Sequence, residues 1–333
     1  MRPGGRGVAE VTYLEALRQG LREEMRRDEN VFILGEDVGL YGGAFKVTEG
    51  FLAEFGASRV IDTPIVEAAI VGAAAGAAHM GMRPVVEMQF IDFISCAYNM
   101  LTNYVATARY RAGLACPMVV RGPYGGYVRG GPFHSQCPEA AFFHTPGLKI
   151  VAPATARDAK GLIKAAVRDP DPVLYFEHKF LYRRIKEDLP EDEEVLTPIG
   201  VARVAREGTD LSIVTWSAMV WKALDAAQRL EQEDGLSVEV LDLRTLLPMD
   251  DAAILATVRK TSRVMIVHED TRTGGLAGEI TARINASAFE WLDAPVRRVT
   301  AADVPLPYAP SLEDAVLPQT EDIVRMAREL AAY

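Results

Sequence analysis

The chain of 333 residues is poor in cysteine, with only Cys96, Cys116 and Cys137. Their number is odd, and their spacing lacks the pairs that are typical of zinc sites and disulfide frameworks. We therefore expect neither kind of cross-link, and a reducing, cytoplasmic compartment is the expected location.

Long apolar runs are also missing. The longest run of small apolar residues, 68–82, is shorter than the roughly 20 residues that a membrane span needs. Glu67 precedes this run and His79 lies within it. The opening MRPGGRG has no apolar core of the kind a secretion signal requires, so we expect a frayed tail there. The sequence predicts no contact with a membrane.

An excess of positive charge is absent, since 36 Lys and Arg stand against 46 Asp and Glu, a formal net charge of -10. This balance argues against a general nucleic-acid binder and favours a basic partner surface. GxGxxG and GxxxxGK[ST] are absent as well, so the dinucleotide and P-loop classes lack their phosphate cradles. The length and the 49% hydrophobic composition predict a globular protein of about two domains.

The first half alternates short β-branched runs with helical stretches, which predicts a parallel sheet with helices on both faces. Strands are expected at 31–37, 59–63, 84–90, 117–122, 148–153 and 172–178, and helices near 12–27, 46–55, 64–80, 93–111 and 155–168. Residues 184–198 are charged and contain proline, and are interpreted as a linker. The predicted domains are 8–190 and 198–333.

The second half repeats the alternation, with strands expected at 210–216, 237–243, 263–270 and 296–300. Four strands with three crossover helices predict a small parallel sheet. The tail 304–318 is rich in proline, so no regular structure is expected there, and a last helix, EDIVRMAREL, follows it. The predicted fold class is α/β, with two doubly wound parallel-sheet domains.

Ligands of doubly wound sheets bind beyond the carboxyl ends of the strands. Four loops at such ends carry unusual polar groups, namely 35–45, 62–72, 87–93 and 121–137. In the second loop Thr63 is expected to cap a helix and Pro64 to be its first residue, which places Glu67 in the first turn. This acid could simply complement the helix dipole. Its apolar neighbours instead predict a raised pKa and a role in acid–base chemistry.

His134 lies in the fourth loop, among glycines and aromatic residues. It is either a surface histidine without a task or an active-site group. Cys137 suggests a Cys–His nucleophile, but no third orienting group is evident nearby. Gly72 and Gly76 allow close approach of another helix, in a core or at a subunit contact.

Nine motifs in order, from about Tyr13 to Val324, resemble one known family. They are LGEDVG (34–39), DTPIVEAAIVG (62–72), EMQFIDF (87–93), RYRAG (109–113), FHSQCPEA (133–140), DAKGLIKAAVRDPDPV (158–173), FEHKFLYR (176–183), LDLRTLLPMD (241–250) and HEDTRTGG (268–275). The family is the beta subunit of the thiamine-diphosphate-dependent decarboxylating component of 2-oxo acid dehydrogenase complexes. The resemblance implies a transketolase-like pyrimidine-binding domain followed by a transketolase C-terminal domain.

The resemblance assigns Glu67 to N1′ of the aminopyrimidine, where proton sharing favours the imino tautomer and formation of the ylide nucleophile. Attack on the 2-oxo carbon, loss of carbon dioxide and acyl transfer to a lipoyl group follow, and His134 handles protons in these steps. The remaining positions that the resemblance implies are Glu36, Ile65, Val66, Gln89 and Phe93 for the cofactor, and Phe90, Ile91 and Asp92 for the substrate. Phe93 stands where many branched-chain members have Tyr, so a phenolic hydrogen bond is absent here.

The resemblance also implies a monovalent-cation site, occupied by potassium and built mostly from carbonyl oxygens. Its positions are Cys116, Met118, Val119, Ala166, Asp169 and Asp171. A plain DPDP turn explains the two aspartates equally well.

Thiamine enzymes that work as one chain carry a GDG segment, and this sequence has none. The resemblance therefore implies that an alpha subunit holds the diphosphate and magnesium, in a heterotetramer of two alpha and two beta chains. The acidic balance suits docking of a basic subunit-binding domain from the lipoyl acyltransferase core.

The predicted function is the beta subunit of a branched-chain 2-oxo acid dehydrogenase, in branched-chain amino acid catabolism. The segment 176–183 is shared with pyruvate and acetoin dehydrogenase beta subunits, which stay open as alternatives. A transketolase-like or deoxyxylulose-phosphate-synthase-like enzyme is opposed by the missing GDG. A catalytically inactive assembly scaffold is opposed by the presence of both Glu67 and His134.

Overall fold

The computed structural model describes residues 8–190 and 194–333. The predicted frayed tail and residues 191–193 of the predicted linker lie outside the described residues. The described chain divides into two compact units. Unit 1 contains the residues up to Pro123 together with Thr145–Ile199, and unit 2 contains Tyr124–His144 and Gly200–Tyr333. The segment 124–144 thus belongs to unit 2, although it lies inside the first predicted domain range.

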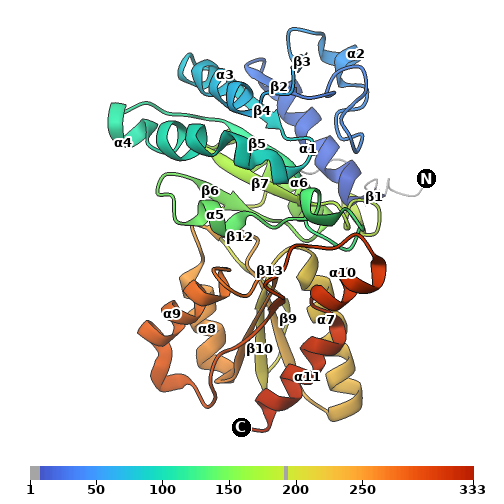
Figure 1. The fold of residues 1–333 in the computed structure, drawn as a ribbon, viewed down its shortest axis with the longest axis vertical. Helices are drawn as coiled ribbons and strands as arrows, with labels where there is room; N and C mark the ends of the chain where they lie inside the picture. The colour runs from blue at the N-terminus through green and yellow to red at the C-terminus, as the bar shows by residue number, and fades with distance from the viewer. Residues whose placement is uncertain (1–7, 191–193) are drawn as a thin grey trace, which may run out of the picture. The chain divides into compact units, whose positions relative to one another are not determined.

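Unit 1 is built on a parallel sheet, as the sequence predicts (Figure 1). Its strands lie in the order β6 (Lys149–Val151), β7 (Val173–His178), β5 (Val119–Tyr124), β4 (Arg83–Glu87), β2 (Val31–Gly35) and β3 (Val60–Asp62). The central strands β2, β5 and β7 are buried along their whole length, as expected for strands covered on both faces.

Two helices of unit 1 begin at side-chain caps. Thr12 forms a capping box with Glu15 at the start of α1 (Tyr13–Arg27), and Thr155 caps α6 (Ala156–Arg168) as predicted. These two helices pack against each other.

Two predicted helices of unit 1 differ from the structure. The helix expected over 46–55 is only α2 (Phe51–Phe55), preceded by Gly50 in the left-handed region. The stretch expected as one helix over 93–111 is divided into a 3-10 segment (Ile91–Ala97), a π segment (Met100–Val105) and α4 (Ala108–Ala112). The Thr102 and Thr107 hydroxyls donate to main-chain oxygens four residues earlier, a side-chain bond that competes with regular helix geometry.

The interpretation of 184–198 as a linker was wrong over part of its length. Residues Lys186–Pro190 form β8, which pairs antiparallel with β1 (Val8–Thr12) in a separate two-stranded sheet. Leu189 is buried there, and Lys186 pairs with Glu10 at 3.1 Å. The charges that suggested a linker lie on the exposed positions of an edge strand.

The sheet of unit 2 has the order β14 (Arg297–Ala301), β13 (Val264–Thr271), β10 (Leu211–Thr215), β11 (Val238–Asp242) and β9 (Arg203–Arg206). The first four strands are the predicted parallel sheet. The fifth strand, β9, was not predicted; it pairs antiparallel with β11 at the edge, where no position is fully buried. Such a strand has no apolar run by which to recognise it.

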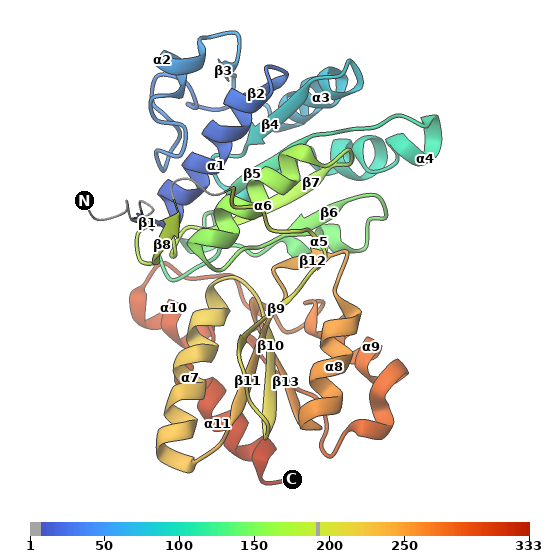
Figure 2. The same ribbon diagram turned by 180° about the vertical axis from the view of Figure 1, so that it is seen from behind.

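Helices cover both faces of this sheet. α7 (Ala218–Asp234) packs with α11 (Thr320–Ala331) on one face, and α8 (Asp251–Thr261) packs with α9 (Ala277–Ala288) on the other (Figure 2). Shorter segments are α5 (Glu139–Phe143), β12 (Thr245–Leu247) and 3-10 turns at Gly131–Phe133 and Phe289–Trp291.

The proline content of the tail 304–318 predicted no regular structure there. This prediction was wrong for part of the tail, because Pro310–Val316 form α10. Pro310 is the first residue of this helix. This position tolerates proline, because the N–H of a first helical residue has no partner within the helix.

Within the described ranges, no helix has the length and apolar character that a membrane crossing requires.

Candidate active site

Three of the predicted loops begin at the same edge of the unit 1 sheet. In the register of the parallel strands, Gly35 of β2 is level with Asp62 of β3 and with Glu87 of β4. The chain therefore leaves all three strands at one height, and the loops that follow them are neighbours.

Glu36 and Glu67 interact at this edge. Glu36 follows β2 directly and is buried; burial raises its pKa, and the negative charges of Glu67 and Asp37 raise it further. Glu67 is half-buried and is the first residue of α3 (Glu67–His79), where the helix N-terminus favours a carboxylate. The site thus contains two neighbouring acids, and the pKa of Glu36 is raised by its burial and by the charge of the other.

The start of α3 differs from the expectation. Val66 is the residue before the helix, so Thr63 does not cap it and Pro64 does not belong to it. Ile65 and Val66 precede Glu67 with 75% and 51% of their surface exposed. The apolar neighbours that the sequence predicts for Glu67 are therefore present, but their side chains are too exposed to enclose its carboxyl group.

The loop after β4 supplies further predicted site residues. Gln89 donates to the Asp37 carboxylate at 3.3 Å, which joins this loop to the loop that carries Glu36. Ile91 and Asp92 are buried, whereas Phe90 and Phe93 are half-buried. Of the predicted substrate-lining residues, Phe90 therefore presents more surface than Ile91 or Asp92.

Phe45 also belongs to this site, although the sequence analysis did not identify it. Its ring meets Phe90 edge-on, with 5.5 Å between the ring centres, and lies 5.4 Å from Tyr182. Aromatic pairs at this distance restrict each other's orientation. Phe45 thus backs a residue that the resemblance assigns to the substrate.

A buried ionic network lies behind these loops. The Arg121 guanidinium donates to Glu87 and Glu177, and Tyr182 donates to Glu177 at 2.6 Å. Burial raises the pKa of Glu87, against the lowering effect of Arg121. A Cβ on Gly43 would lie 2.6 Å from the Glu87 carboxylate, so the loop rests directly on this network. The sequence signal for this network is one charged residue inside each of three adjacent strands, β4, β5 and β7.

The predicted cation positions come together at the other end of the sheet. The Cys116 N–H donates to Pro170 at 3.2 Å, and burial beside Asp171 raises the pKa of Cys116 to about 11. Asp169 pairs with Lys149 at 2.7 Å and Asp171 with Arg109 at 2.5 Å. Both carboxylates thus have basic partners, which leaves main-chain carbonyls as ligands for a monovalent cation.

Those carbonyls can accept one more ligand each. The oxygens of Cys116 and Met118 already accept N–H groups from Met118 and Val173. Since a carbonyl oxygen has two lone pairs, the geometry permits a cation but does not require one. Among the described residues, no group of three or more His, Cys, Asp and Glu is placed to hold a metal ion.

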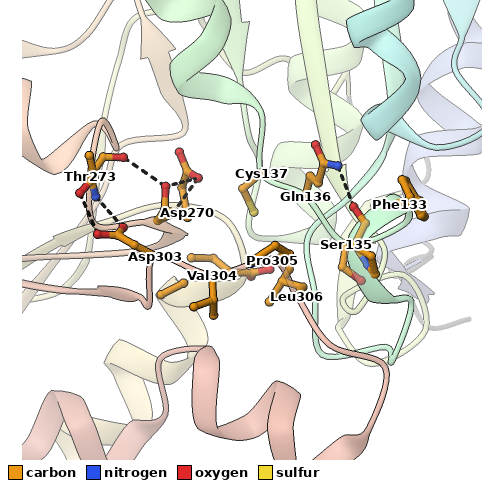
Figure 3. Close-up of a pocket in the computed structure, with 14 residues that line it drawn as sticks. Phe133, Ser135, Gln136, Cys137, Asp270, Thr273, Asp303, Val304, Pro305 and Leu306 are labelled. Atoms are coloured by element: carbon orange, nitrogen blue, oxygen red, sulfur yellow. Dashed lines mark hydrogen bonds between the residues drawn. The ribbon is translucent and has the colours of Figure 1, made fainter.

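His134 belongs to unit 2, where it follows the 3-10 turn Gly131–Phe133 and is half-buried. Its neighbours border a cavity of about 570 Å³ (Figure 3). The cavity is lined from the loop by Pro132, Phe133, Ser135, Gln136 and Cys137, from the end of β13 by Glu269, Asp270, Thr271 and Thr273, and from the tail by Ala301, Asp303, Val304, Pro305 and Leu306. Figure 3 shows Asp270, Thr273 and Asp303 on one side and Phe133, Ser135 and Gln136 on the other.

Titratable groups with shifted pKa values adjoin this cavity. Burial raises the pKa of Asp270 to about 6, and burial together with the charge of Asp270 raises that of Glu139 to about 8. His268 stacks on Trp216 with 5.4 Å between ring centres, and burial lowers its pKa to about 4. At neutral pH this part of unit 2 therefore holds a neutral histidine and a protonated carboxyl group.

Comparisons with known proteins agree with this architecture. The family "Transketolase, pyrimidine binding domain" matches residues 9–184, and the family "Transketolase, C-terminal domain" matches residues 200–323. Among solved structures, a split-gene transketolase described as an inactive beta4 tetramer has a TM-score of 0.77 at 22% identity, covering 97% of this chain and 98% of that one. This likeness concerns the fold alone.

Curated relatives are similar over nearly the whole chain. The 2-oxoisovalerate dehydrogenase subunit beta of Bacillus subtilis is 49% identical, over 97% of this chain and 99% of that protein. The mitochondrial pyruvate dehydrogenase E1 component subunit beta-1 of Arabidopsis thaliana is 46% identical, over 97% and 90%. The pyruvate dehydrogenase E1 component subunit beta of Bacillus subtilis is 43% identical, over 98% and 100%.

Proposed function

This chain belongs to the family of beta subunits of the decarboxylating component of 2-oxo acid dehydrogenases, and from this premise we propose that it is the branched-chain member, acting with thiamine diphosphate. The observation that carries the proposal is the pair formed by buried Glu36 and Glu67 at the carboxyl edge of the sheet. The greater identity to the 2-oxoisovalerate enzyme favours branched-chain substrates, and pyruvate and acetoin types are the alternatives.

The residues present fit the aminopyrimidine of thiamine diphosphate. The chemistry that this cofactor supplies when bound is carbanion stabilisation for decarboxylation of a 2-oxo acid. Glu67 would hold a proton at the N1′ atom of the ring, with the carboxyl group of Glu36, whose pKa is raised, beside it. Phe93 and the apolar pair Ile65 and Val66 would cover the ring and exclude water. Gln89 would keep its loop in place through Asp37.

His134 would hold and move protons during decarboxylation and acyl transfer to the lipoyl group. Phe90, backed by Phe45, would limit the space for the side chain of the 2-oxo acid. In this proposal, the enzyme is an oxidoreductase whose reaction is completed by the lipoyl acyltransferase component.

The exposed apolar side chains beside Glu67 support an incomplete site. Leu40 and Tyr41, in the loop that follows β2, are also exposed, at 91% and 57%. The neighbouring Gly39 N–H donates to Asp62, which ends the strand before Ile65 and Val66. Clustered apolar surface of this kind marks a contact with another protein. We assign that contact to an alpha subunit, which would hold the diphosphate and magnesium in a heterotetramer with a second beta subunit. The lipoyl acyltransferase core, a potassium ion at the carbonyls near Cys116 and a cytoplasmic location belong to the same proposal.

The decisive experiment is Glu67→Gln in the chain expressed with its alpha subunit. The amide keeps the shape of the carboxyl group but cannot relay a proton, so we expect turnover to fall by about 100-fold or more. Assembly, measured by light scattering, should be unchanged. Glu29→Gln is the matched control, because Glu29 is exposed just before β2, at the opposite edge of the sheet. Wild-type turnover in Glu67→Gln would instead support the non-catalytic scaffold.

Substrate class is tested separately, by the ratio of kcat/KM for 3-methyl-2-oxobutanoate and for pyruvate. The branched-chain proposal requires the ratio to exceed one. A ratio below one would move the chain to the pyruvate type without affecting the role of Glu67.

A further inference from the structure

We propose that Arg129 and Glu313 are positioning residues for the reaction, because they hold the loop that carries His134 against α10. The proposal rests on the proposed function, in which His134 acts on protons. All the contacts that support it lie within unit 2.

The backbone of this loop has an unfavourable conformation. Tyr127 and Arg129 have φ values of 62° and 64°, in the left-handed region that large side chains rarely adopt. Gly131 follows at φ 67°. Such a conformation persists only where surrounding contacts impose it.

The first part of the loop is attached to β13 and to the tail. The Gly126 N–H donates to the buried carboxylate of Glu269. The Tyr127 hydroxyl donates to the Pro318 carbonyl at 2.7 Å, and the Lys222 ammonium lies 4.4 Å from the centre of the Tyr127 ring. These contacts hold Tyr127 but lie well before His134 in the chain.

Arg129 attaches the loop to α10 five residues before His134. Its guanidinium donates to Glu313 at 2.6 Å, to Asp314 at 2.7 Å and to the Pro310 carbonyl at 3.0 Å. The Arg129 main-chain N–H donates to the second Glu313 oxygen at 3.2 Å. Glu313 thus grips both the side chain and the backbone of one residue.

The environment of Glu313 distinguishes this contact from an ordinary surface pair, because removal of Arg129 would leave a buried carboxylate without its partner. Glu313 is fully buried, so its charge must be compensated by the two donors of Arg129. Asp314 is 48% exposed at its side chain, and its pair with Arg129 is of the kind that contributes little to stability. Loss of Arg129 would therefore leave Glu313 buried without these donors, whereas Asp314 would remain in contact with solvent.

The segment between Arg129 and His134 is tightly packed, so it can transmit a displacement. A Cβ on Gly130 would lie 2.8 Å from the His134 carbonyl oxygen, and one on Gly131 would lie 2.2 Å from the Tyr308 ring. The Gly125 N–H donates to Gln136 at 3.1 Å and closes the loop on the far side of His134. If Arg129 is released, the position of His134 is expected to change.

The test is a double-mutant cycle in the enzyme expressed with its alpha subunit, with transfer of the acyl group to a lipoyl domain as the measured rate. Arg129→Met should lower kcat about 10-fold while KM changes little, since misplaced groups lose rate rather than binding. Arg129→Lys should recover part of the loss. In the His134→Ala background, Arg129→Met should have less than about a twofold effect, because the group that it positions is gone.

Two further variants test the partner of Arg129 and the specificity of the effect. Glu313→Gln should reproduce the loss seen in Arg129→Met. Arg229→Met is the matched control, because Arg229 also pairs with two carboxylates of unit 2, Glu233 and Glu321, but far along the chain from the loop. Wild-type kcat is expected for this control.

Three outcomes would overturn the inference. Unchanged kcat in Arg129→Met would show that the contact is not needed. An equal loss in the wild-type and His134→Ala backgrounds would show a general structural effect. Unchanged turnover in His134→Ala itself would contradict the proposed role of this histidine. That result would refute the proposed function, whereas the first two outcomes would refute only the roles of Arg129 and Glu313.

Discussion

Replacement of Glu139 by Gln should remove a defined part of the pH dependence of stability. Glu139 is buried in unit 2, and its Oε1 accepts from the Trp216 indole N–H at 3.1 Å. Its Oε2 has no hydrogen-bond partner among the described residues. Burial and the charge of Asp270 raise its pKa from 4.5 to about 8. The amide of Glu139→Gln has the shape of the protonated acid and cannot ionise.

The sign of the effect follows from proton binding. Between pH 4.5 and about 8 the folded chain keeps a proton on Glu139 that the unfolded chain has lost, so stability falls as the pH rises. His268 acts in the opposite direction, because its pKa is lowered from 6.5 to about 4 and its contribution rises with pH across that range. Above pH 7 His268 is mostly neutral in both states, and Asp270, with a pKa of about 6, is mostly ionised in both.

The window from pH 7 to 8 therefore isolates Glu139. A fully coupled proton changes the free energy of unfolding by about 1.4 kcal/mol per pH unit, and the coupling falls to about half at the folded pKa, so the wild-type chain should lose about 1 kcal/mol across this window. In Glu139→Gln the same window should be nearly flat.

Urea unfolding followed by tryptophan fluorescence measures this difference. The three tryptophans, Trp216, Trp221 and Trp291, all lie in unit 2, so the signal reports the unit that contains Glu139. Glu290→Gln, at an exposed position of the same unit, should keep the wild-type slope. Equal slopes in the wild type and Glu139→Gln would refute the reasoning.

Two further substitutions test the buried network and the histidine loop. Arg121→Met leaves Glu87 and Glu177 without their buried partner and should lower the free energy of unfolding by about 3–5 kcal/mol, measured by calorimetry; a loss below about 1 kcal/mol would contradict this. Gly131→Ala places a methyl group on the Tyr308 ring at a positive φ, and should lower kcat about 10-fold in steady-state assays. Wild-type kcat would show that the loop adjusts freely.

Much of the fold could be predicted because local patterns carried it. The β-branched runs near 31–37 and 238–242 mark strands that are buried on both faces. Such strands are apolar along their whole length, because neither face contacts water. The cap at Thr155 was predicted correctly because it is also a local feature: its hydroxyl accepts from the N–H of Asp158, only three residues away.

Elements that depend on distant partners were not predicted. Residues 186–190 form a strand only because β1 lies beside them, and 203–206 only because β11 does. The helix Pro310–Val316 forms where Arg129 binds Glu313, 184 residues away in the chain. In each case the stabilising contact is absent from the local sequence.

The candidate site shows the same division. The sequence by itself determined that the loops 35–45, 62–72 and 87–93 are candidate segments, because parallel strands place their carboxyl ends at one edge, and the family resemblance then assigned Glu36, Glu67 and Gln89 within them. Only the tertiary structure decided that Glu36 is buried beside a second carboxylate, that Phe45 backs Phe90, and that the loop of His134 is held by α10. Burial and charge pairing depend on what surrounds a side chain in space, and residues far apart in the sequence supply those surroundings.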